Sequence, residues 1–261
     1  RSGRVTGVQT CALPIYYTLE IGGENSDPKA FLLELLEDQL LQTCHYSPWA
    51  SEPACNPDVA PTTPDYSGNQ GYMDPAPDGV DMQYAWDHSA FGDGLSSYWI
   101  QDLETAWCEN HEDLNDSFTI YHDNGIEGDH GAAVIGVMGA CDNGFGITGM
   151  VHDCYMTARN WDGVSGTSYP DVSAAIAETG VSLLTGETYL IEIHAPGPSQ
   201  GTTCTCNCDQ FEFIAMEYWT DNFDAIAANS ANGIFCAEAG GNGSMDLDNA
   251  EIGRASCRER V

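Results

Sequence analysis

Apolar residues along the chain alternate between short continuous runs and repeats at helical spacing. Residues 27–41 have an N-cap candidate at Asp27, Pro28 at the first helical position and apolar residues at helical spacing, so they predict a helix. Beyond them, strand-like and helix-like segments follow one another, which indicates βαβ units around a parallel sheet. The predicted strands cover 98–101, 149–158, 188–193 and 234–239, and the predicted helices cover 130–139, 171–184 and 217–229.

Between the first predicted helix and these units, residues 47–77 are rich in Pro, Ser, Asn and Asp. Such a composition is typical of an exposed linker or a surface extension.

Both ends of the chain depart from this organisation. Residues 251–261 can be encoded by a DNA stretch that resembles a standard short-read sequencing adapter, and residues 5–15 resemble the partner adapter in the opposite sense. Sequence of that origin is left out of fold reasoning. We therefore expect residues 1–15 and 251–261 to be non-native, and the remainder to be a piece of a longer protein.

The charge is strongly acidic, with 40 Asp and Glu against 7 Lys and Arg. Five of those seven basic residues lie in the two end segments, which leaves only Lys29 and Arg159. A nucleic-acid-binding face is excluded because phosphate contacts need clustered Lys and Arg. The acidic residues are interleaved with apolar ones, which favours a globular domain adapted to salt or divalent cations over a disordered tail. No run is long enough to predict a membrane span.

Nine of the 11 cysteines lie between the two end segments. So many cysteines without CxxC pairs predict an oxidising compartment and disulfides. The cluster Cys204-Thr-Cys-Asn-Cys208 could instead hold a metal, but its alternating spacing is not that of a zinc knuckle and no His lies near it.

Three polar residues stand where predicted strands end or predicted helices begin. Asp102 follows the first strand, His130 opens a helix between glycines, and Asn242 follows the last strand within a glycine-rich turn. Active residues of parallel α/β sheets gather at the carboxyl ends of the strands.

The motifs around these residues resemble those of the subtilisin-like serine proteases over Gly71 to Asp248. They are Asp-x-x-x-x-Trp-x-x-x-His-x-Asp-Leu from Asp102, Asp-His-Gly-x-x-Val-x-Gly from Asp129, Asp-Asn-Gly-x-Gly-x-x-Gly from Asp142 and Glu-Ala-x-Gly-Asn-Gly from Glu238. The resemblance implies a three-layer α/β/α fold with a central, mostly parallel sheet that is incomplete at its C-terminus. Residues 16–65 would be a propeptide remnant and linker, and 66–250 the first part of the catalytic domain.

The resemblance also implies a role for each polar residue. Asp102 would orient His130, which would act as general base and then as general acid, and Asn242 would donate its amide to the oxyanion of the tetrahedral intermediate. Gly197, Gly240 and Gly241 would let the backbone approach an extended peptide substrate, which is expected to pair with the strand that ends near Gly197.

Two departures from the family pattern are visible. Ala132 replaces the usual Thr after His-Gly, and the loop after Asp102 is about two residues longer than in ordinary subtilisins. The serine nucleophile is also missing, because no Gly-Thr-Ser-x-Ala motif follows Asn242. Ser168, in Gly166-Thr-Ser168, precedes Asn242 and suits a loop and N-cap better.

The implied function is a secreted, monomeric serine endopeptidase that hydrolyses peptide bonds of protein substrates through an acyl-enzyme, although this chain itself would be inactive. The alternatives are a catalytically dead subtilisin-like binding domain and an acidic metal-binding module. No cofactor is required; calcium is possible, but no EF-hand loop or other ligand set is evident. His122 and His152 are expected in loops. His111 with Asp113 resembles the family's structural His-x-Asp-Leu turn, for which a surface role is favoured over catalysis. His194 ends the predicted strand at 188–193, and no chemical role is expected for its side chain.

Overall fold

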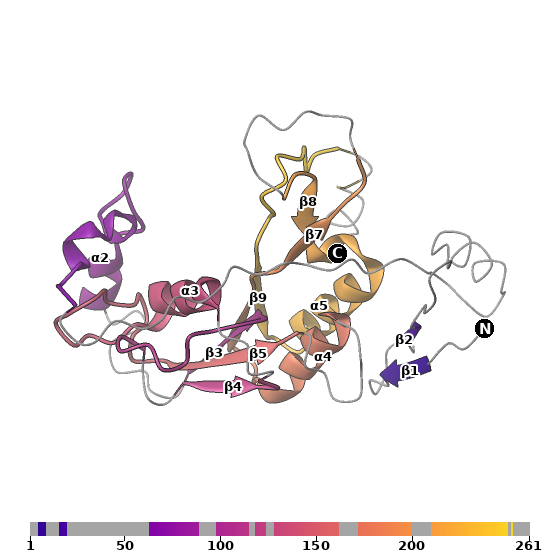
Figure 1. The fold of residues 1–261 in the computed structure, drawn as a ribbon, viewed down its shortest axis with the longest axis horizontal. Helices are drawn as coiled ribbons and strands as arrows, with labels where there is room; N and C mark the ends of the chain where they lie inside the picture. The colour runs from indigo at the N-terminus through magenta and orange to yellow at the C-terminus, as the bar shows by residue number, and fades with distance from the viewer. Residues whose placement is uncertain are drawn as a thin grey trace. The chain divides into compact units, whose positions relative to one another are not determined.

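The computed structural model describes residues 5–8, 16–19, 63–88, 98–114, 118–123, 128–161, 172–199, 210–249 and 252 (Figure 1). The predicted helix at 27–41, most of the predicted linker, Ser168 and the Cys204–Cys208 cluster lie outside these residues. The first two of these ranges are strands, and β1 (Val5–Val8) pairs antiparallel with β2 (Tyr16–Leu19).

The predicted α/β class is confirmed by a mostly parallel sheet of five strands in the order β4-β5-β3-β6-β9. Strand β3 pairs in parallel with β5, and β5 pairs in parallel with β4. The bounds of the strands are β3 Trp99–Glu104, β4 Thr119–Tyr121, β5 Tyr155–Asn160, β6 Thr188–Ile191 and β9 Phe235–Glu238.

Strand β3 is longer than the apolar run that predicted it. The pattern ended at Gln101, whereas the strand continues to Glu104 and is fully buried from Gln101 onward. The register pairs Asp102 with Ala158 and Glu104 with Asn160, the last residue of β5. Glu104 therefore stands at the carboxyl end of β3, and Asp102 lies inside the strand.

The predicted strand at 149–158 is wrong in its first half. Residues 150–153 form a turn that folds back on the preceding helix, since Val151 N–H donates to Met138 O at 2.7 Å and Cys154 N–H donates to Val151 O at 2.8 Å. The apolar residues Met150 and Val151 gave this segment a strand-like composition, but the turn satisfies their backbone groups.

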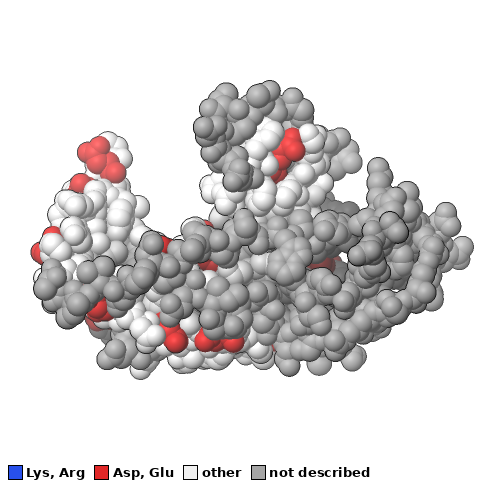
Figure 2. All heavy atoms as spheres, in the orientation of Figure 1, with Lys and Arg blue, Asp and Glu red and all other residues white. Residues whose placement is uncertain are grey.

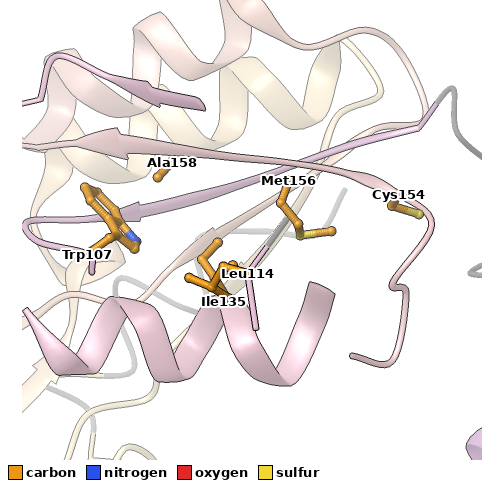
Figure 3. Close-up of a cluster of buried hydrophobic side chains, with 6 residues drawn as sticks. All are labelled: Trp107, Leu114, Ile135, Cys154, Met156 and Ala158. Carbon is orange, nitrogen blue, oxygen red and sulfur yellow. The ribbon is translucent and has the colours of Figure 1, made fainter. Parts of the chain in front are cut away.

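The chain divides into two compact units, one made of residues 51–160 and 186–190 and the other of the remaining segments. In the first unit, helix α3 (Asp129–Gly139) packs on β3. Figure 3 shows Ile135 pointing from α3 toward the strands. Ile135 belongs to a hydrophobic core cluster of six buried residues, namely Trp107, Leu114, Ile135, Cys154, Met156 and Ala158. The unit also contains η1 (Ser67–Asn69), η2 (Gly71–Met73) and α2 (Met82–Asp87).

In the second unit, helices α4 (Val172–Ser182) and α5 (Thr220–Ala231) pack against each other. The buried Asn229 side chain donates to Ile176 O at 2.8 Å and fills the space beside Gly180, where a Cβ would collide with it. Strand β7 (His194–Pro196) pairs antiparallel with β8 (Phe213–Ala215), which leads into η3 (Met216–Tyr218). The predicted strand at 188–193 therefore ends at Ile191, and a second strand begins at His194.

Acidic side chains occupy the described surface. Figure 2 shows Asp and Glu scattered over the visible face. Among the described residues Arg159 is the one Lys or Arg, and it is buried, with its Nε donating to Gln101 Oε1 at 3.1 Å. None of the described helices combines the length and the apolar character that crossing a membrane requires.

Candidate active site

Two carboxylates lie two residues apart at the carboxyl half of β3. Asp102 and Glu104 are both completely buried. Because side chains alternate between the two faces of a strand, these two point to the same face. That face is covered by α3, so both carboxylates lie beneath the helix that carries His130.

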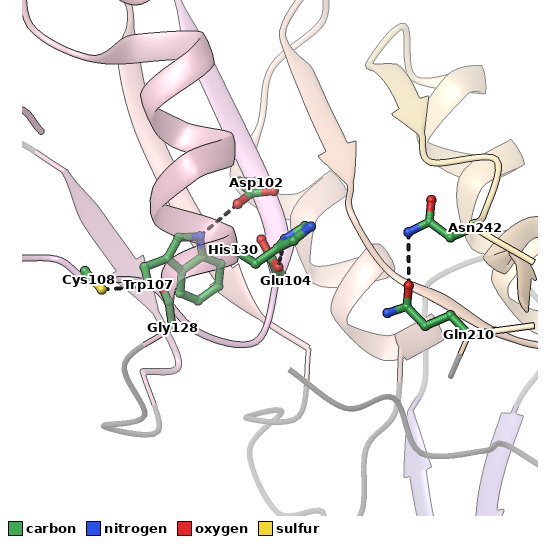
Figure 4. A network of polar contacts seen from close by, with 8 residues as sticks. All are labelled: Asp102, Glu104, Trp107, Cys108, Gly128, His130, Gln210 and Asn242. Atoms are coloured by element: carbon green, nitrogen blue, oxygen red, sulfur yellow. Dashed lines mark hydrogen bonds and ion pairs between the residues drawn. The ribbon is translucent and has the colours of Figure 1, made fainter. Parts of the chain in front are cut away.

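His130 lies in the first turn of α3, and its Nδ1 contacts Oε1 of Glu104 (Figure 4). The two side chains differ in burial, with 44% of the imidazole exposed and 1% of the Glu104 side chain. An ionised carboxylate only accepts hydrogen bonds, so this contact places a proton on Nδ1 and leaves the lone pair of the neutral ring on Nε2. The geometry therefore supplies a buried acid that orients an accessible base.

Asp102 has a different partner. Its Oδ2 accepts the indole N–H of Trp107 at 2.8 Å, and Trp107 is itself buried. The sequence predicted the orienting role for Asp102, whereas in the structure it is Glu104 that contacts Nδ1 of His130. The loop after Asp102, about two residues longer than in the family that the motifs resemble, was a signal that pointed to a residue two positions further along.

Asn242 belongs to the other compact unit and lies in an exposed turn after β9. Its backbone N–H donates to Nδ1 of His194 at 3.2 Å, and its side-chain Nδ2 donates to Oε1 of Gln210 at 3.0 Å (Figure 4). The second Nδ2 hydrogen can therefore serve an external acceptor such as an oxyanion. Sequence reasoning missed Gln210, and no motif marks it.

Glycines allow the Asn242 turn to lie directly on β8. Gly241 has φ of 92°, a conformation that other residues rarely adopt. Gly243 N–H donates to Phe213 O, and Glu212 N–H donates to Gly243 O, both at 3.0 Å. Side chains at these glycines would collide with the Phe213 backbone. The residues before and after Asn242 are thus both held against the backbone of β8 and the residue before it.

The other two glycines predicted for substrate binding lie in the same unit. Gly197 follows β7, donates its N–H to Glu212 O at 2.8 Å and is packed against Ile214. Gly240 is exposed, and a Cβ there would contact only Leu247, at 3.8 Å. The packing of Ile214 leaves no room for a side chain at position 197, whereas a side chain would fit at position 240.

Glu238, the last residue of β9, has a perturbed carboxyl group. Burial raises its pKa to about 7, and the neighbouring Glu217 carboxylate acts in the same direction, whereas hydrogen bonds from backbone N–H groups oppose the shift. One of these bonds is donated by Glu217 N–H to Oε1 of Glu238 at 2.9 Å. Glu238 thereby connects the end of β9 to η3, four residues before Asn242.

Asp113 has a structural role, but its side chain is buried and not at the surface, where it was expected. The buried carboxylate accepts Asn143 Nδ2 at 3.0 Å and Ile147 N–H at 2.8 Å, and so holds the turn after α3. His152 Nδ1 lies 3.2 Å from Gly149 O in the next turn. Cys154 is a buried free thiol. Within the described ranges, no group of three or more His, Cys, Asp or Glu could hold a metal ion.

No protein-family model matches the chain, and no curated protein matches it either. What the chain can do chemically is therefore argued from the geometry of the two sites described above.

Proposed function

We propose that the chain is part of a subtilisin-like serine endopeptidase in which Glu104 and His130 form the acid–base pair. The observation that carries this proposal is the contact of the half-exposed imidazole of His130 with a fully buried carboxylate at the end of a parallel strand. A buried acid fixes the tautomer of the base, and Nε2 of the half-exposed ring would then act on a substrate-side group.

In the proposed reaction, Nε2 of His130 removes the proton from a serine hydroxyl as its oxygen attacks the carbonyl carbon of a peptide. This chain carries no Gly-Thr-Ser-x-Ala motif after Asn242, so the proposal requires a longer protein to supply that serine. The resulting imidazolium is stabilised by Glu104 and returns the proton to the leaving amine as the C–N bond breaks. Water then hydrolyses the acyl-enzyme by the same transfers in reverse order.

Asn242 would donate the second hydrogen of its side-chain amide to the oxyanion that forms when the serine attacks. Gln210 already holds the first hydrogen, and this fixes the plane of the amide before substrate binds. Strand β7, which pairs with β8 through one edge, would offer backbone groups near Gly197 to an extended peptide. Secretion and disulfides among the nine cysteines between the end segments remain part of this proposal.

The test is hydrolysis of a denatured protein substrate by the full-length enzyme and its variants. Glu104→Gln should lower kcat by about 10⁴-fold, because the base then loses the acid that orients it. His130→Ala should lower kcat by about 10⁶-fold, because only binding and oxyanion stabilisation remain. Asp102→Asn serves as the matched control and should retain most of the activity. An Asp102→Asn enzyme as inactive as Glu104→Gln would return the orienting role to Asp102. A full-length protein that binds peptides without hydrolysing them would support a catalytically dead binding domain instead.

A further inference from the structure

Asp102 and Trp107 form a second buried polar pair next to the proposed acid–base pair. The Asp102 carboxylate is 0% exposed and Trp107 is 2% exposed, with the indole N–H donating to Oδ2 at 2.8 Å (Figure 4). An isolated carboxylate or indole N–H is costly to bury, and the bond between them offsets part of that cost. The proposed reaction uses neither group directly.

Trp107 lies against the turn of α3 that carries His130. A Cβ at Gly131, the residue after His130, would come within 2.6 Å of Trp107 Nε1 and would also collide with Ala106 O. A Cβ at Gly128, just before α3, would come within 2.7 Å of Ala106 Cβ. Cys108 Sγ lies 3.5 Å from Gly128 O. The segment after β3 is therefore packed closely against the first turn of α3.

The position of the indole is set by Asp102. The side chain of Trp107 can rotate about two bonds, and the bond from Nε1 to the rigid strand β3 selects one orientation of the ring. That orientation determines where Gly131 and hence the backbone of His130 can lie above Glu104. The two carboxylates of β3 thus act on the same histidine by different routes.

We propose that Asp102 and Trp107 are positioning residues for His130. Asp102 fixes the indole of Trp107, the indole fixes the first turn of α3, and this turn brings Nδ1 of His130 to Glu104. The inference rests on the proposed function only for the catalytic meaning of the Glu104–His130 contact. The positioning itself is a property of the chain and can be measured without the serine.

The test is the tautomer of neutral His130, obtained from the ¹⁵N chemical shifts of its ring nitrogens in the chain of 261 residues. In the unchanged chain the Nδ1–H form should predominate, because Nδ1 donates to Glu104. Trp107→Phe and Asp102→Ala should shift the population toward the Nε2–H form. Asp102→Asn should retain the original tautomer, since its side-chain oxygen can still accept the indole N–H.

Asp113→Ala is the matched control, because it removes another buried, hydrogen-bonded carboxylate of the same unit. It should lower the melting temperature without changing the His130 tautomer. If Trp107→Phe fails to fold, the comparison of Asp102→Ala with Asp102→Asn gives the same answer. An unchanged tautomer in Asp102→Ala would overturn the proposal, as would the loss of the Nδ1–H form in Asp102→Asn.

Hydrolysis by the full-length enzyme separates this inference from the proposed function. Asp102→Ala and Trp107→Phe should lower kcat by about 10–100-fold with little change in KM, since misplacement of a catalytic group by about 1 Å costs this much. Asp102→Asn should restore kcat to within a few fold. A full-length protein without hydrolytic activity would refute the proposed function, whereas the tautomer measurements would still decide the positioning.

Discussion

The carboxylate of Glu104 meets Nδ1 of His130 across 26 positions of the sequence, with the acid at the end of a strand and the base at the start of a helix. The strand and the helix are brought together by the buried segment around Ala106 and Trp107. Five predictions test this arrangement, the Asn242 turn, the packing that supports each of them and the buried carboxyl group of Glu238.

Two of the three glycines of helix α3, Gly131 and Gly136, have opposite surroundings. Gly131→Ala should destabilise the chain by about 1–3 kcal/mol, because the added methyl group collides with Ala106 O and Trp107. Gly136→Ala meets only Ile147 Cδ1, at 3.4 Å, and should be neutral or stabilising by up to about 1 kcal/mol because alanine favours the helix. Urea unfolding measures both. Equal destabilisation by the two substitutions would contradict the close fit at Gly131.

The core beneath α3 gives a second matched pair, Ile135 and Val137. Ile135→Ala should destabilise by about 2–4 kcal/mol, since the side chain is 1% exposed and lies in the hydrophobic cluster. Val137 is 37% exposed, so Val137→Ala should cost less than about 1 kcal/mol. A thermal melt of each variant provides the comparison, and a reversed order would show that α3 presents a different face to the sheet.

The Asn242 turn should respond to protonation of His194. Asn242 N–H donates to Nδ1 of His194, and a protonated imidazole has no lone pair there to accept it. The backbone amide signal of Asn242 should therefore move in an ¹⁵N NMR titration, with the same midpoint as the His194 ring. In His194→Phe this dependence should vanish. An amide shift that follows another histidine would show that His194 does not control the turn.

Gln210→Ala tests the side-chain half of the same turn. The substitution removes the oxygen that accepts a hydrogen bond from Asn242 Nδ2, so kcat of the full-length enzyme should fall while KM stays nearly constant. The loss should be smaller than for Asn242→Ala, for which about 10²–10³-fold is expected of an oxyanion donor. Equal losses would mean that Gln210 contacts the oxyanion itself.

Glu238 predicts a stability that depends on pH. Burial raises its folded-state pKa to about 7 from an ordinary value of 4.5, so the folded chain binds more protons than the unfolded chain between these values. The contribution of Glu238 is fully present below pH 4.5 and is lost as pH rises through about 7. The loss amounts to about 3 kcal/mol.

Glu238→Gln removes this titration while retaining an oxygen that can accept the backbone N–H of Glu217. The variant should match the unchanged chain at pH 4 and exceed its free energy of unfolding at pH 8, as measured in urea. Glu217→Gln, which removes only the neighbouring charge, should give a smaller gain of the same sign. A Glu238→Gln chain with no advantage at pH 8 would show that the carboxyl group is solvated.

The expectations that held were those fixed by local sequence. The glycines and the polar residue at the start of the helix placed His130 in the first turn of α3, because Gly128 and Gly131 leave room for the backbone. The glycine-rich turn after an apolar run placed Asn242 beyond β9, since Gly241 requires a positive φ. Alternating apolar segments similarly predicted the parallel sheet.

The choice between Asp102 and Glu104 could not be made from the hydropathy pattern. Both carboxylates point to the same face of β3, and the apolar run ended before either of them, so hydropathy did not show where the strand stops. Burial of polar residues in β3 depends on partners that come from elsewhere, such as Trp107 for Asp102 and His130 for Glu104.

The sequence by itself therefore determined that His130 lies in the first turn of a helix and that Asn242 follows a strand in a glycine-rich turn. Local propensity and glycine content are sufficient for that. Only the tertiary structure decided that Glu104 meets His130 while Asp102 binds Trp107, and that Gln210 and His194 hold Asn242. These pairings depend on how far along β3 the helix α3 is seated and on how closely the glycine turn lies on β8, and both are set by packing between segments distant in the chain.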